Sequence, residues 1–87
     1  MNIKDLKNSF ENLKQRVLKA EGQKVAAEVG KIVAAINEAI AEKNNTDKYK
    51  LVMQKVYNAA SKAEGAISNN ENLADLQSLI SKLSAIK

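Results

Sequence analysis

The sequence predicts an all-α protein: an antiparallel four-helix bundle that forms a single domain over residues 1–87. Three observations favour this fold class. Apolar residues recur every three or four positions through most of the chain, which is the spacing of one face of a helix. Proline is absent, and the three aromatic residues are too few for a β-rich core. One glycine and two clusters of Asn, Ser, Thr and Asp divide the chain into four segments.

The first predicted helix covers residues 2–21 and has one narrow apolar stripe. The residues of this stripe are Ile3, Leu6, Phe10, Leu13, Val17 and Ala20. Gly22 is the expected end of the helix, because glycine adopts the left-handed conformation of a helix C-terminus without strain. The alternative is one continuous helix through Gly22, since a glycine inside a helix costs only about 1 kcal/mol. The tetrapeptide Lys-Ala-Glu-Gly at residues 19–22 recurs at residues 62–65.

The second predicted helix, residues 23–43, is the most apolar segment and is expected to be the most buried. One face carries large residues: Val25, Val29, Ile32, Val33, Ile36 and Ile40. A second face carries small residues, Ala26, Ala27, Gly30, Ala34 and Ala41, and a narrow third stripe carries Lys24, Glu28, Lys31, Ala35, Glu38 and Glu42. A helix that is apolar over most of its circumference has neighbours on several sides. We therefore expect this helix at the centre, with another backbone close to its small face.

One polar residue, Asn37, lies on the small face of this second helix. Two interpretations stay open for it. A buried asparagine can determine the register of packed helices, whereas a half-exposed one would only line a groove.

The third and fourth predicted helices cover residues 47–68 and 72–86. Residues 44–47 have strong turn and capping preferences, so Thr46 or Asp47 is expected to cap the third helix. Its predicted core face holds Tyr49, Val52, Met53, Val56, Ala60, Ala63 and Ile67. Residues 68–72 interrupt the pattern, and the fourth helix then presents Leu73, Leu76, Leu79, Ile80, Leu83 and Ile86 on one side.

The composition excludes several classes of function. The chain has no histidine and no cysteine, so it lacks a disulfide, a thiol nucleophile, the usual zinc ligands and the commonest general base. We therefore expect no enzyme, no metal, no cofactor and no small-molecule substrate. The net charge of +4 is modest and Arg16 is the single arginine, which argues against nucleic-acid binding. No apolar run could span a bilayer and no signal peptide is evident, so a cytoplasmic protein is expected.

A row of lysines on the third predicted helix is the most site-like feature of the sequence. Lys48, Lys55 and Lys62 recur every seven residues, with Leu51 beside them. One interpretation is a plain solvent-exposed edge. The other is a basic, lightly apolar face that binds an acidic protein partner or lipid headgroups.

The stretch DKYKLVMQKVYNAASK, residues 47–62, resembles the immunity proteins against pediocin-like (class IIa) bacteriocins. The resemblance begins at VGKIVAAINEAIAEKNN, residues 29–45, and continues into NENLADLQSLISKL, residues 70–83. It implies a non-catalytic, cytoplasmic antiparallel four-helix bundle that acts at the inner face of the membrane. There it would block the pore formed when the bacteriocin captures a sugar-phosphotransferase permease. Specificity would lie in the C-terminal half, whose expected exposed residues are Lys48, Leu51, Lys55, Lys62 and Lys82.

Two other classes of function remain open from the sequence. One is a small helical inhibitor, secreted as a virulence factor or phage-encoded, that binds a host protein. The other is a homo-oligomeric structural or secretion subunit. We expect a monomer, because helix 23–43 can bury its strong faces within one domain. A stable dimer would instead assign Ala26, Gly30 and Ala34 to self-association.

Overall fold

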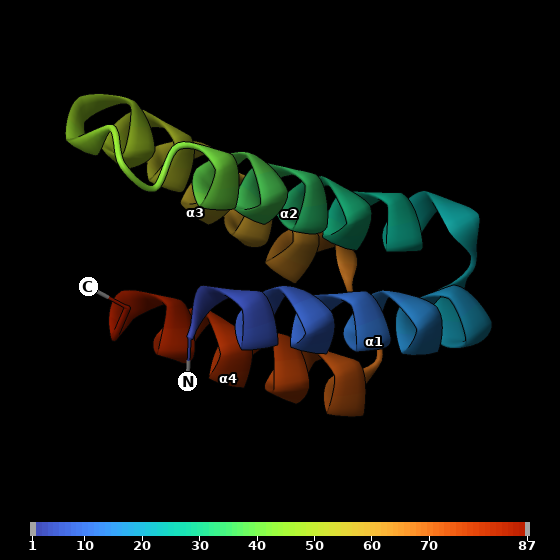
Figure 1. Ribbon diagram of the computed structural model, residues 1–87. Helices are drawn as coiled ribbons and strands as arrows, with labels where there is room; N and C mark the ends of the chain where they lie inside the picture. The colour runs from blue at the N-terminus through green and yellow to red at the C-terminus, as the bar shows by residue number, and fades with distance from the viewer. Residues whose placement is uncertain (1, 87) are drawn as a thin grey trace.

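Four helices form a closed ring around one core in the computed structural model, which describes residues 2–86 (Figure 1). They are α1 (Ile3–Glu21), α2 (Gln23–Ala41), α3 (Thr46–Ala66) and α4 (Asn70–Ser84). Each helix packs against the next along the chain, and α4 returns to pack against α1. Figure 1 shows α2 and α3 side by side in one layer, with α1 and α4 in the other. The predicted all-α antiparallel bundle is confirmed.

All four helices contribute to the core, and α2 contributes the most buried positions. The predicted core residues Val29, Ile32 and Ile36 have no exposed surface. The largest fully buried side chains come from every helix: Phe10, Leu6, Leu13, Ile32, Ile36, Leu76, Leu83, Val17, Val29 and Val56. The periodicity in the sequence therefore identified most of the buried positions, with exceptions that include Ala20, which is exposed, and Ala35, which is buried.

The predicted central position of α2 is wrong. Within residues 2–86, α2 contacts α1 and α3 but not α4, because each helix of a four-membered ring keeps an outer side in solvent. Its small face is largely this outer side. Ala26 is buried, but Ala27, Ala34 and Ala41 are exposed. Where a second backbone was expected, the atoms nearest to a Cβ added at Gly30 belong to the Lys14 side chain.

The charged stripe of α2 lies along the seam with α3, although Lys24, Lys31 and Glu38 remain exposed to solvent. Ala35, in the middle of this stripe, is buried with 8% of its surface exposed, and Glu28 and Glu42 are half-buried. Asn37 is exposed, so it does not determine the register of the bundle. The seam between α2 and α3 therefore contains both alanines and charged side chains.

Gly22 separates α1 from α2, as predicted, and one continuous helix is excluded. Its backbone has φ +93° and ψ −178°, a region that is essentially restricted to glycine. The Gly22 N–H donates to the Leu18 carbonyl over 3.0 Å, which satisfies one of the last carbonyls of α1. A turn this short makes α1 and α2 antiparallel neighbours.

The other predicted boundaries differ by one or two residues. α2 ends at Ala41 rather than 43, because the N–H of Glu42 is shared between the carbonyls of Glu38 and Ala39 as the last turn tightens. Asn45, not Thr46 or Asp47, caps α3; its side chain accepts from the Lys48 N–H over 3.3 Å. Its extended backbone directs its amide oxygen toward the unpaired N–H groups of the first turn.

The remaining differences lie at the ends of α1, α3 and α4. Asn2 caps α1 by accepting from Asp5, so this helix starts at Ile3. α3 ends at Ala66 rather than 68, because Ile67 takes an extended conformation that buries its side chain. Asn69 caps α4, which therefore covers Asn70–Ser84 rather than 72–86.

Candidate partner-binding site

The lysine row of Lys48, Lys55 and Lys62 lies on the side of α3 that faces α2. The Lys48 Nζ atom is 3.4 Å from Glu42 Oε1, and the Lys55 Nζ atom is 3.7 Å from Glu38 Oε1. Both lysine side chains keep more than half of their surface exposed. Such exposed pairs contribute at most about 1 kcal/mol each, since water screens them. Glutamates of α2 therefore neutralise part of the positive charge of the row. Because these ion pairs are weak, the lysines can exchange them for contacts with another molecule.

Leu51 is the most exposed large apolar residue of the described chain, with 61% of its surface accessible. It lies one helical turn from Lys48 and one turn from Lys55. Its side chain is not part of the buried core. The structure therefore places an exposed apolar group directly among the basic ones, as the sequence predicted.

Two shallow hollows follow the seam between α2 and α3, and we call them together the α2–α3 groove. One, of about 580 Å³, is lined by Lys24, Val25, Glu28, Lys62, Gly65 and Ala66. The other, of about 430 Å³, is lined by Lys31, Ala34, Ala35, Glu38, Lys55 and Ala59. The groove is consequently floored by small apolar residues and edged by charged ones.

Lys82, the fifth predicted site residue, does not join the row. It lies on the opposite seam of the ring, between α1 and α4, where it lines a small polar hollow with Arg16 and Asp75. The lysine row and Lys82 therefore belong to different surfaces. Sequence periodicity could not separate them, because it assigns faces within a helix and not neighbours between helices.

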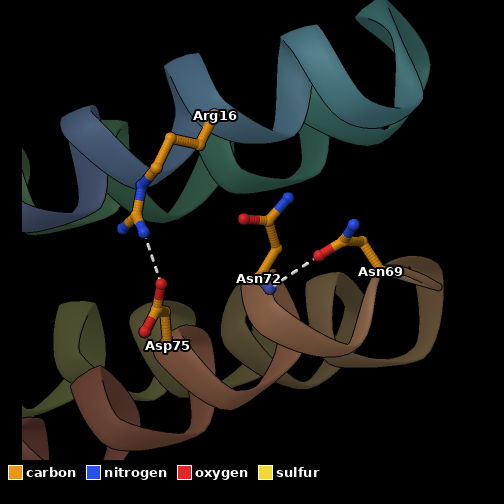
Figure 2. A network of polar contacts seen from close by, with 4 residues as sticks. All are labelled: Arg16, Asn69, Asn72 and Asp75. Atoms are coloured by element: carbon orange, nitrogen blue, oxygen red, sulfur yellow. Dashed lines mark hydrogen bonds and ion pairs between the residues drawn. The ribbon is translucent and has the colours of Figure 1, made fainter.

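The seam between α1 and α4 is held by polar contacts that the sequence analysis missed (Figure 2). Arg16 on α1 forms an ion pair with Asp75 on α4. The same view shows a second bond, which lies within the start of α4: the side chain of the N-cap residue Asn69 accepts from the Asn72 N–H over 3.0 Å. Asn72 is the buried polar residue of the described core, with 6% of its surface exposed. The sequence did not indicate which asparagine of residues 69–72 would be buried, because all of them have the same capping preference.

A carboxylate from the end of α1 fixes the loop that precedes α4. Glu21 Oε1 accepts from the Ser68 N–H over 2.8 Å, and Glu21 Oε2 accepts from the Asn69 N–H over 3.3 Å. These two backbone groups have no partner within α4, so Glu21 supplies a cap from another helix. α4 is therefore anchored to α1 at both Glu21 and Arg16, and it packs more closely with α1 than with α3.

The described residues offer no cluster of three or more acidic groups that could hold a metal ion. Within residues 2–86, no helix combines the length and the apolar character that a bilayer span requires. Each hollow described above is shallow and open to solvent.

Among known proteins, the chain matches no family model, and no curated protein or solved structure shows significant similarity to it.

Proposed function

We propose that this chain is a non-catalytic binding protein that gives a producing cell immunity to a pediocin-like, pore-forming bacteriocin. The observation that carries the proposal is Leu51, exposed between Lys48 and Lys55 on α3. α3 is also the helix over which the sequence resembles such immunity proteins most closely. The antiparallel bundle is the architecture that this resemblance implies.

The proposed action takes place in the cytoplasm, at the inner face of the membrane. The protein would bind there as a monomer to a permease that the bacteriocin has already engaged, and would block the pore. Leu51 would insert its apolar side chain into the partner, and Lys48, Lys55 and Lys62 would exchange their weak intramolecular pairs for acidic groups of the partner. Because Lys82 lies on another seam, it would contribute only if the partner also covers α4.

The direct test is to express the chain inside a sensitive strain and to challenge the cells with a panel of class IIa bacteriocins. Protection against one or a few peptides is the expected result. If no peptide in the panel is blocked, the immunity function is wrong, and a helical inhibitor of a host protein becomes the better hypothesis.

Substitution of Leu51→Ser tests the site within the same assay. Loss of a central apolar contact should lower the tolerated bacteriocin concentration by roughly tenfold or more. Leu18→Ser is the matched control, since Leu18 on α1 is the other exposed large apolar residue of the described chain. Equal protection by both variants would leave the function in place and remove Leu51 from the site.

The lysines are best tested by neutralisation rather than by charge reversal. Reversal at Lys48 or Lys55 would place a carboxylate against Glu42 or Glu38 and would destabilise the α2–α3 seam. The triple variant Lys48→Gln, Lys55→Gln, Lys62→Gln removes the positive charges without creating repulsion. If this variant protects as well as the parent, the lysine row is ordinary solvated surface.

A further inference from the structure

The α2–α3 groove has a regular charge pattern along both of its edges. Lys24 and Lys31 lie two turns apart on α2, and Lys55 and Lys62 lie two turns apart on α3. Because the helices are antiparallel, Lys24 shares one hollow with Lys62, and Lys31 shares the other with Lys55. The four lysines cover about two helical turns on each helix.

The acidic residues of the groove do not balance its lysines. Glu28 lies 3.5 Å from the Lys31 Nζ atom, and Glu38 pairs with Lys55. Lys24 and Lys62 form no ion pair within the described part of the chain. Four lysines against two glutamates leave a net positive charge around an apolar floor of Val25, Ala34, Ala35, Ala59 and Ala66.

We propose that the α2–α3 groove binds an acidic amphipathic helix of a protein partner. The small floor residues let a third helix approach closely, and an apolar stripe on that helix would cover them, as in other helix-in-groove complexes. Carboxylates on both flanks of the stripe would reach the two lysines on each edge, in the manner of the flanking charges of a coiled coil. This inference rests on the proposed function only in placing the partner on the face that carries the lysine row.

The same geometry disfavours binding of a helix with basic flanks. A basic flank would lie against Lys24 and Lys62, which form no ion pair among the described residues. Like charges at an interface cost affinity, so charge would select the partner as well as attract it.

The probe for the test is a designed peptide of about three heptads, with alanine and leucine on its apolar stripe and glutamate on both flanks. An isomer with lysine on the flanks is its control. Each peptide is titrated at low ionic strength into the isotopically labelled full chain, and amide chemical shifts are followed. The acidic peptide should shift the amides of α2 and α3 along the groove, the basic isomer should not bind, and added salt should weaken the complex.

Two pairs of variants separate the groove from general charge. Lys24→Gln with Lys62→Gln should weaken the acidic peptide by about tenfold, whereas Lys4→Gln with Lys19→Gln on α1 should leave its affinity unchanged. Ala34→Gln places a long side chain on the floor and should also weaken binding. Its control is Ala27→Gln, an exposed alanine of the same helix that does not line the groove.

Several results would overturn the proposal. These are shifts that map outside α2 and α3, equal binding of the basic isomer, or association of the chain with itself through the groove. Binding of phosphatidylglycerol vesicles through the same lysines, without binding of the acidic peptide, would assign the surface to lipid instead. The peptide titration and the protection assay fail independently: protection without peptide binding refutes the acidic helix, and peptide binding without protection refutes immunity.

Discussion

Glu21 and Glu64 occupy the same place in a repeated tetrapeptide, yet their surroundings differ. Glu21 ends α1 and accepts two backbone N–H groups from the loop before α4. Glu64 lies within α3, is exposed, and makes no hydrogen bond or ion pair within the described residues. At the scale of one residue, tertiary context alone decides which carboxylate stabilises the fold.

Removing the Glu21 carboxylate should lower the free energy of unfolding by about 1–2 kcal/mol, since two backbone groups lose a charged acceptor. The change is Glu21→Ala, measured by urea denaturation. Glu64→Ala is a matched control with the same gain in helix propensity, and it should stay within about 0.5 kcal/mol of the parent. Equal stabilities for the two variants would show that the loop before α4 does not depend on Glu21.

At the scale of the helices, the sequence predicted the existence, the order and most of the buried positions of each one. These features follow from apolar periodicity, which is a property of each segment alone. The ends were displaced by one or two residues because Asn45 and Asn69 compete with neighbouring polar residues for the same capping role. Which of them caps depends on backbone angles, and these are set by the packing of the whole loop.

The candidate site was predicted less completely than the helices. The exposure of Leu51 and of the lysine row follows from their position outside the core face of α3. The carboxylates of α2 beside Lys48 and Lys55, and the distance of Lys82 from the row, depend on the order of helices around the ring. Helical spacing contains no information about that order, so the α2–α3 groove could not be predicted from the sequence.

Gly22, between α1 and α2, and Gly65, within α3, should respond oppositely to alanine. Gly22→Ala forces a side chain into a positive-φ conformation and should cost about 1–3 kcal/mol. Gly65→Ala fills open space on α3, where an added Cβ meets no atom within 4 Å, and should stabilise by about 0.5–1 kcal/mol. Thermal unfolding followed by circular dichroism gives both signs. If Gly22→Ala stabilised the protein instead, α1 and α2 would be able to form one continuous helix.

At the scale of the whole molecule, one core is shared by four helices, so its loss should unfold them together. Ile36 is fully buried in α2, and Ile36→Ala should cost about 2–5 kcal/mol. This is a large fraction of the stability of so small a domain. Urea unfolding followed by helix content and by tyrosine fluorescence should give coincident transitions. Leu51→Ala, at an exposed position, is the control, and a parent-like midpoint for Ile36→Ala would contradict the assigned core.

The ring described above has a consequence for the covalent order of the helices. Asn2 and Ile86 line one hollow at the same end of the bundle as the turn between α2 and α3 (Figure 1). A short linker could therefore join these two positions, and the chain could be opened at residues 42–45 instead. The permuted order α3, α4, α1, α2 would keep every pair of neighbouring helices. The order of the helices along the chain is thus separable from their order around the ring, and the same ring could be built from a chain that begins at α3.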